Sequence, residues 1–190
     1  MNRPQYAPLP AKLIPNLGLR NRNTLGFDSF AELAYEITSA AQIPALMNSI
    51  ADQNQPWRVL GGGSSVVLPA SLSGVTLLMN IDGQAVTTSD AQADCIEVGA
   101  GVNWHEFVVW TLEKNVPGLE NLALIPGTVG AAPIQNIGAY GAEVADFIDS
   151  IEAFDTQAHA CVTLPKEACQ FAYRDNYFER HPQQYIVTKV

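Results

Sequence analysis

The stretch of sequence that decides the fold reads Pro126-Gly127-Thr128-Val129-Gly130-Ala131-Ala132-Pro133-Ile134-Gln135-Asn136-Ile137-Gly138-Ala139-Tyr140-Gly141. It combines four glycines, two prolines and a Gln-Asn pair with almost no charge. Glycine permits positive φ and lets a flat ligand lie against the main chain, where a Cβ would collide. The neighbouring amides of Gln135 and Asn136 suit a heterocycle with alternating C=O and N–H groups. Residues 126–141, here called the cradle, are therefore predicted to hold a cofactor.

A second glycine-rich segment lies upstream of the cradle. Residues 57–60 are typical of a short strand, and Gly61-Gly62-Gly63-Ser64-Ser65 follows, here called the glycine turn. Consecutive N–H groups in such a turn can form an anion-binding nest, to which serine hydroxyls add donors. The turn leads into the apolar run 66–68 and not into a helix, which argues against a Rossmann domain and a P-loop. A tight hairpin is the alternative interpretation.

Hydrophobic periodicity predicts alternating helices and strands. Alternation at residues 33–37 predicts a strand, and helical spacing at residues 43–50 predicts a helix capped by Thr38 or Ser39. An amphipathic helix is expected over residues 104–114, with Asn103 as N-cap and an inward face formed by Trp104, Phe107, Val108 and Leu112. Further strands are expected at 75–80 and 95–98, a hairpin at 150–164 around Gln157, and a short helix from Pro165 to about Phe171.

The composition is that of a folded protein without a membrane span. The chain has 190 residues, of which 47% are hydrophobic and 15% charged, and its apolar runs are shorter than the ~20 residues that a span needs. Its net charge of −9 disfavours nucleic acid and anionic membranes as partners. From the composition as a whole, a cytoplasmic location is expected. The three cysteines, Cys95, Cys161 and Cys169, lack metal-ligand spacing, so no metal site is predicted and they are expected to be buried free thiols. His105 is expected to have a structural role.

Five motifs follow one another along the chain: Leu60-Gly-Gly-Gly-Ser-Ser, Val98-Gly-Ala-Gly-Val-Asn-Trp, Gly118-Leu-Glu-Asn-Leu-Ala-Leu-Ile-Pro-Gly, the cradle, and Phe171-Ala-Tyr-Arg-Asp. Their order resembles the UDP-N-acetylenolpyruvoylglucosamine reductase (MurB) family, flavoenzymes of bacterial peptidoglycan precursor synthesis. The resemblance runs from about Asn23 to the C-terminus, and residues 117–141 are close to diagnostic.

The resemblance implies an α+β FAD-binding domain of the vanillyl-alcohol-oxidase/PCMH type with two subdomains, expected at residues 23–82 and 83–190. Residues 1–22 fall outside the match and are expected to be a loose leader. Members of the family have three domains, and the apolar run 185–190 has no turn or cap after it. We therefore expect an N-terminal part of an enzyme, without the substrate domain, its serine proton donor and its late glutamate.

The resemblance implies FAD as cofactor, with its pyrophosphate on the glycine turn and its isoalloxazine on the cradle. No histidine lies in or beside residues 61–65, which favours non-covalent FAD. The cofactor-binding residues expected from the match are Leu60, Gly61, Gly62, Gly63, Ser64, Ser65, Ile125, Pro126, Gly127, Thr128, Gly130, Ala131, Ala132, Ile134, Gln135, Asn136, Gly138 and Ala139.

The reaction implied is the NADPH-linked reduction of UDP-N-acetylglucosamine enolpyruvate to UDP-N-acetylmuramate. By position, Arg174 resembles the family's catalytic arginine, whose planar cation suits an enolate. The alternative for Arg174 is a surface ion pair with Asp175. Tyr140 and Tyr173 are candidate substrate-side hydroxyls, the alternative being packed tyrosines with satisfied hydroxyl groups.

Two positions depart from the family pattern. Ser65 stands where the glycine turn usually ends in asparagine, and Asn176 stands where a serine is common, so the hydrogen bonding at both positions is an open question. Two other functions remain open as well. One is a different flavin oxidoreductase of the same fold, acting on alcohols or lactones, and the other is a non-catalytic flavin-binding fragment.

Overall fold

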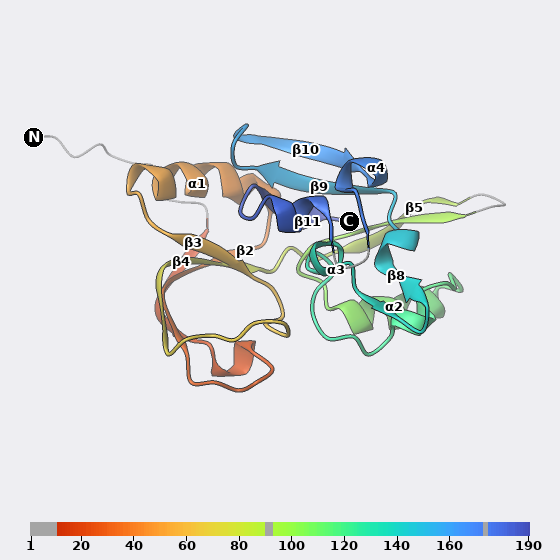
Figure 1. The fold of residues 1–190 in the computed structure, drawn as a ribbon, viewed down its shortest axis with the longest axis horizontal. Helices are drawn as coiled ribbons and strands as arrows, with labels where there is room; N and C mark the ends of the chain where they lie inside the picture. The colour runs from red at the N-terminus through yellow and green to blue at the C-terminus, as the bar shows by residue number, and fades with distance from the viewer. Residues whose placement is uncertain (1–10, 90–92, 173–174) are drawn as a thin grey trace, which may run out of the picture.

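A four-stranded sheet forms the first part of the molecule. The structure, a computed structural model, describes residues 11–89, 93–172 and 175–190. The strand order is β1-β2-β4-β3, with β1 antiparallel to β2, and with β2 and β3 parallel to β4. Figure 1 shows this sheet on the left, with helix α1 above it. The strands are β1 (Lys12–Gly18), β2 (Phe30–Ile37), β3 (Trp57–Leu60) and β4 (Ser71–Met79).

Helix α1 (Ile43–Asp52) connects β2 to β3 and confirms the helix predicted from spacing. The 3-10 turn η2 (Ala40–Gln42) precedes it, and Ser39 caps this turn in a capping box with Gln42. The apolar side chains at helical spacing are all buried: Ile43, Leu46, Met47 and Ile50. One face of α1 is therefore held against the sheet by hydrophobic burial.

The prediction of a loose leader over residues 1–22 is wrong for the part that the structure describes. Lys12–Gly18 forms β1, an edge strand paired along most of its length with β2. Leu19 follows it and is fully buried, ahead of the 3-10 turn η1 (Arg20–Arg22). Most β1 side chains are exposed, so the hydrophobic alternation that marks a strand is weak there, and the ladder bonds of the main chain order the segment instead.

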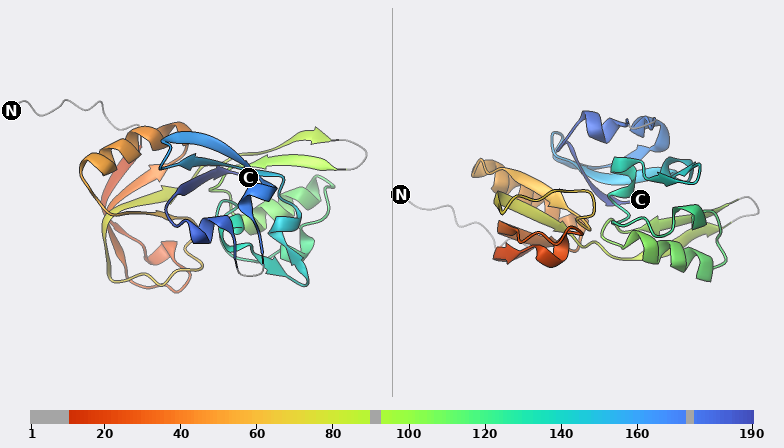
Figure 2. Two further views of the ribbon diagram at one scale, coloured as in Figure 1. Left: turned by 45° about the horizontal axis from the view of Figure 1, so that its top comes forward. Right: turned by 60° about the horizontal axis from the view of Figure 1, so that its bottom comes forward.

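A second group of strands follows residue 83. The hairpin β5 (Gln84–Ser89) and β6 (Asp94–Val98) and the antiparallel sheet β10-β9-β11 belong to it. The three strands of that sheet are β9 (Ser150–Asp155), β10 (Ala160–Pro165) and β11 (Tyr185–Lys189), and β9 with β10 confirms the predicted hairpin. Main-chain bonds join Val98 to Val190 in both directions, so the edge of β6 meets β11. Figure 2 shows these elements grouped apart from the first sheet.

Helix α2 (Trp104–Glu113) begins where it was predicted, because the Asn103 side chain caps it by accepting the N–H of Glu106. Its inward face differs from the prediction at one position. Leu112 is 45% exposed, and Thr111 is buried in its place. At about 100° per residue, Thr111 lies within about 20° of Trp104 around the helix, whereas Leu112 lies about 80° away.

Short elements complete the chain between the strands. They are η3 (Glu120–Leu122), α3 (Ala132–Gln135), β7 (Gly138–Ala139), β8 (Ala142–Glu143), η4 (Val144–Asp146), α4 (Lys166–Cys169) and α5 (Tyr177–Arg180). Helix α4 follows Pro165 as predicted and ends two residues before Phe171. None of the helices in the described part of the chain is long and apolar enough to cross a membrane.

The main core is continuous between the first sheet and the elements after residue 83. It contains Ile37 and Val75 from the first sheet together with Trp104 and Phe154. All three cysteines are free, but the prediction that they are buried holds for Cys169 alone, because Cys95 and Cys161 occupy exposed positions on β6 and β10. Burial raises the pKa of the Cys169 thiol to about 11, so this thiol stays protonated near neutral pH.

Candidate functional site

The glycine turn follows the carboxyl end of β3, which ends at the buried Leu60. Residues 61–70 form no strand, and β3 pairs in parallel with β4, so the hairpin interpretation is wrong. Gly63 has φ +65°, and a Cβ there would collide with the carbonyl oxygen of Arg22. The N–H of Thr24 donates to the Gly63 carbonyl. Residues 22–24 thus hold the turn in a shape that only glycine permits.

The glycine turn and the cradle touch each other. A Cβ on Gly62 would lie 3.0 Å from the Gly127 Cα, and one on Gly61 would lie 2.7 Å from the Thr128 hydroxyl oxygen. The Ser64 hydroxyl donates to the Pro126 carbonyl over 3.1 Å. Two segments that are distant in the sequence therefore meet, and their junction, here called the crevice, is the candidate cofactor site.

The main chain of the glycine turn offers donors to a ligand. None of the N–H groups of Gly61–Ser65 donates a hydrogen bond to any part of the described chain. Gly62 and Ser65 are exposed. Because main-chain donors are normally satisfied, five consecutive free ones indicate a site for an anionic group. Neither the turn nor the cradle contains a lysine or arginine, so neutral donors supply the binding.

Helix α3 lies within the cradle, and the two amides at its carboxyl end face different partners. The Gln135 Oε1 accepts from the Ser65 hydroxyl at 3.1 Å, which leaves the Gln135 Nε2 as a donor. The Asn136 Nδ2 donates to Glu143 at 2.8 Å, and its Oδ1 accepts the N–H of Ala145. The carboxamide of Asn136 is thus bonded within the fold, and only that of Gln135 faces the glycine turn.

The close approach at Gly138 also lies within the fold. Gly138 pairs with Glu143 in the β7–β8 ribbon, and a Cβ there would lie 2.9 Å from the Ala142 carbonyl oxygen. Glycine is required at this position by the neighbouring strand. A ligand lying against the main chain, as predicted for the glycines of the cradle, is therefore not what requires glycine at position 138.

The remaining cofactor-binding candidates line or support the same crevice. Val129 and Gly130 donate their N–H groups to the carbonyls of Val102 and Ala100, so main-chain hydrogen bonds attach the cradle to the loop 99–102. Thr128 and Ala132 are buried, and Ile125 and Ala139 are half-buried and pack against the main core. Ala131 stands at the N-cap of α3, and the side chain of Ile134 is partly exposed.

The substrate-side candidates are only partly within the described chain. Tyr140 is 90% exposed and has φ +52° at the turn between β7 and β8, so it is not packed against any part of the described chain. Tyr173 and Arg174 lie outside the described residues. The residues on either side of them, Ala172 and Asp175, are joined by two main-chain hydrogen bonds, and the carboxylate of Asp175 pairs with Arg180.

Sequence reasoning did not identify two supports of the crevice. Asn176 is 1% exposed and donates from its Nδ2 to the carbonyl of Ile134 in α3. The Arg22 carbonyl, in a segment that was expected to be loose, leaves room only for glycine at position 63. The one available signal was the departure of Asn176 from the family pattern, which marked the position without giving its partner.

Two residues before the cradle have structural roles. The Glu120 carboxylate accepts main-chain N–H groups, including that of Gly118 at 2.6 Å, and these bonds lower its pKa below the usual value. His105 accepts the N–H of Leu124 at its Nδ1, which agrees with the structural role expected for it. Both side chains accept hydrogen bonds from the main chain of the segment that leads into the cradle.

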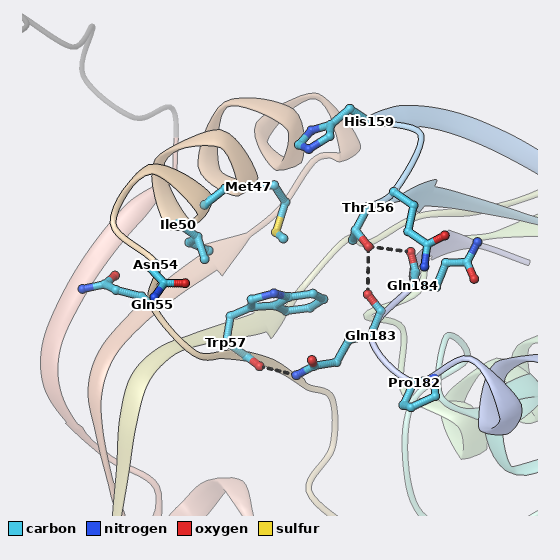
Figure 3. A pocket seen from close by; sticks show the side chains of 12 residues that line it. Met47, Ile50, Asn54, Gln55, Trp57, Thr156, His159, Pro182, Gln183 and Gln184 are labelled. Carbon is cyan, nitrogen blue, oxygen red and sulfur yellow. Dashed lines mark hydrogen bonds between the residues drawn. The ribbon is translucent and has the colours of Figure 1, made fainter.

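A separate pocket of about 420 Å³ lies at the amino end of β3. Figure 3 shows the Trp57 indole in its middle, below Met47 of α1 and beside the turn that carries Gln183. The Gln183 Nε2 donates to the Trp57 carbonyl at 2.8 Å and ties the two parts of the molecule together. No Lys, Arg, Asp or Glu lines this pocket in the described chain. Trp57 and Gly61 are four strand residues apart, about 13 Å, so the pocket is distinct from the crevice.

Comparisons with known proteins show an FAD-binding family and related reductases. The profile of a family described as "FAD binding domain" matches residues 31–163. The UDP-N-acetylenolpyruvoylglucosamine reductase of Polynucleobacter asymbioticus is 67% identical over 190 residues, which is 100% of this chain and 55% of that protein. The chain spans about half the length of the curated relatives that it matches.

Two solved structures show the fold. The MurB reductase of Thermus caldophilus has a TM-score of 0.69 at 26% identity, over 95% of this chain and 60% of that one. p-Cresol methylhydroxylase has a TM-score of 0.60 at 14% identity, over 85% of this chain and 35% of that one. The expected α+β fold of the vanillyl-alcohol-oxidase/PCMH type is thereby confirmed.

The crevice fits FAD on its own features. Free N–H groups suit a pyrophosphate, and the absence of a side chain at Gly62 lets its main chain approach that of Gly127 in the cradle. The profile match spans β2 to β10 and includes both sides of the crevice. By fold, crevice and sequence, the chain belongs to the family of FAD-binding domains.

Proposed function

We propose that this chain is the FAD-binding part of an NADPH-linked reductase. The enzyme reduces UDP-N-acetylglucosamine enolpyruvate to UDP-N-acetylmuramate in peptidoglycan precursor synthesis, in the cytoplasm. The observation that carries the proposal is the contact between the glycine turn and the cradle, at the two motifs that define the resemblance. The 67% identity to a reductase of that name supports the choice of substrate.

The proposed cofactor site uses the chain's own main-chain groups. The N–H groups of Gly61–Ser65 bind the pyrophosphate, and the cradle carries the isoalloxazine, with the Gln135 Nε2 as a donor to its polar edge. FAD, when bound, supplies two-electron transfer between NADPH and the enolpyruvyl double bond. It is held without a covalent bond, since the glycine turn contains no histidine. The two sides of the crevice belong to subdomains 23–82 and 83–190.

Arg174 is proposed as the catalytic arginine. Negative charge develops on the enolpyruvyl carboxylate side during reduction, and one fixed donor at such a charge contributes about 3 kcal/mol. Tyr140 and Tyr173 are proposed to offer hydroxyl groups to the sugar nucleotide. The exposure of Tyr140, near the end of the cradle, supports this role.

The test measures flavin binding and product separately. We expect the 190-residue chain to bind FAD and to form no UDP-N-acetylmuramate, because it spans 55% of its relative and positioning of the substrate contributes several kcal/mol to catalysis. A chain of the relative's full length should form the product, and its Arg174→Ala variant should lose most of the rate.

The outcome also separates the other two functions. The assay must follow the lactyl product, since oxygen can oxidise NADPH through loosely held flavin. Bound flavin with turnover of alcohols or lactones by the full-length chain would indicate a different oxidoreductase of this fold. Flavin binding without any turnover by the full-length chain would indicate a non-catalytic flavin-binding protein.

A further inference from the structure

Asn176 connects two segments that are far apart in the sequence. Its Nδ2 donates to the main-chain carbonyl of Ile134 at 2.9 Å, and its Oδ1 accepts the N–H of Glu179 at 3.0 Å. The side chain is 1% exposed. Its carboxamide therefore caps α5 with one atom and holds α3 with the other.

Helix α3 depends on such a partner. It has four residues, and an α-helix leaves its last four carbonyls without partners inside the helix. The carbonyls of Ala132 and Pro133 accept N–H groups from residues 136 and 137, where the chain turns through Asn136 at φ +41°. The Ile134 carbonyl has Asn176 as its only partner in the described chain. Without Asn176, this part-buried acceptor would lose its partner in the described chain.

The position of Ile134 sets that of Gln135. The Gln135 amide follows directly and turns its Oε1 to the Ser65 hydroxyl of the glycine turn. The end of α3 is thus held from one side by Ser65 and from the other by Asn176. These are the two positions at which the sequence departs from the family pattern.

We infer that Asn176 is a positioning residue for the cofactor. Its side chain fixes the carboxyl end of α3 and thereby the Gln135 donor. The inference rests on the proposed FAD site. It assigns to Asn176 no contact with the cofactor.

The test uses Asn176→Ser in the 190-residue chain. A serine hydroxyl still accepts the Glu179 N–H, but its side chain is one bond shorter and does not reach the Ile134 carbonyl. We expect the dissociation constant for FAD, from a flavin-fluorescence titration, to rise roughly fivefold, as the loss of one hydrogen bond implies. In the FAD-free chain, amide hydrogen exchange of residues 134–137 should accelerate by roughly the same factor.

Two further variants separate positioning from general stability. Asn176→Ala loses both bonds and should also lower the melting temperature. Ser39→Ala removes the capping box ahead of α1, away from the crevice, and should lower the melting temperature while leaving FAD affinity and exchange at residues 134–137 unchanged.

The inference is overturned if Asn176→Ser binds FAD as tightly as the parent chain, or if exchange at residues 134–137 stays the same. A parent chain that binds no FAD would instead remove the proposed function. In that case the inference fails in its claim about the cofactor, and the exchange data still decide whether Asn176 holds α3.

Discussion

The two ends of β3 differ in which part of the chain forms the surface, the main chain at one end and side chains at the other. At its carboxyl end, the glycine turn offers main-chain N–H groups and almost no side chains. At its amino end, Trp57 lies in a pocket formed by the side chains of α1 and of the turns at 156–159 and 182–184. One strand thus leads from a site defined by backbone shape to a pocket defined by side-chain identity.

This difference predicts which substitutions each end tolerates. A main-chain site is more sensitive to an added Cβ than to the exact polar side chains around it. A side-chain pocket tolerates small changes one residue at a time, because each contact contributes little. Substitutions at the two ends should therefore differ in both size and selectivity.

The largest effect is expected for Gly63→Val. A β-branched residue at φ +65° is strained, and its Cβ would collide with the Arg22 carbonyl, so we expect a loss of about 3 kcal/mol or more in the free energy of unfolding. Urea denaturation measures this. Gly26→Val is the matched control, because Gly26 has φ +66° with open space around its Cβ position. Equal losses in the two variants would show that the collision contributes nothing.

The next effect concerns FAD affinity. Gly62→Val and Gly138→Val should each abolish FAD binding, since the added Cβ would press on Gly127 and on the Ala142 carbonyl and shift the two sides of the crevice. Flavin-fluorescence titration measures the affinity. Gly18→Val is the control, because its nearest neighbour would be the Phe30 ring at 3.8 Å. Unchanged affinity in both crevice variants would defeat this placement of the cofactor.

A smaller effect is expected from Asp155, beside the pocket. The N–H groups of Ala158 and Gln157 donate to its carboxylate and lower its pKa below the ordinary value of 3.8, against the opposing effect of burial. The folded state thus favours the charged form, so this stabilisation is present above pH 3.8 and is lost as the pH falls through the lowered pKa. Asp155→Asn should flatten the acid side of the melting-temperature profile. A profile identical to that of the parent would contradict the assignment.

The smallest effect is expected for Gln183→Asn. Asparagine tolerates the positive φ of +66° but is too short to reach the Trp57 carbonyl. The loss of one exposed hydrogen bond should lower stability by about 1 kcal/mol or less. FAD affinity should stay the same, as a titration of the variant beside the parent will show. A weaker affinity would mean that the two ends of β3 are coupled.

Local patterns predicted most of the regular elements. The spacing of apolar residues and the Asn103 cap located α2, and alternation located β2 and β9. Strand β1 was missed because an edge strand with an exposed proline and few inward side chains carries little periodicity, and only pairing with β2 orders it. Leu112 was misplaced because a one-residue error in helical phase rotates a side chain by about 100°.

The sequence located the candidate site better than its supports. The glycines of both segments and the serines of the glycine turn indicated the candidate site, because the backbone conformation that glycine permits is a local property of the chain. The partners of Asn136 and Asn176 are not local, as each amide bonds to a segment that only the fold brings near. The sequence could therefore predict which two segments form the candidate site, but not which of their amides are bonded within the fold.

The central claim is that FAD binds through the main chain of the glycine turn. Amide NMR of the 190-residue chain during FAD titration tests it most directly. We expect the largest shifts at the N–H groups of Gly61–Ser65, as they donate to phosphate, and little change at the Trp57 indole. Large shifts at Trp57 and the glutamines of its pocket, with residues 61–65 unmoved, would contradict it.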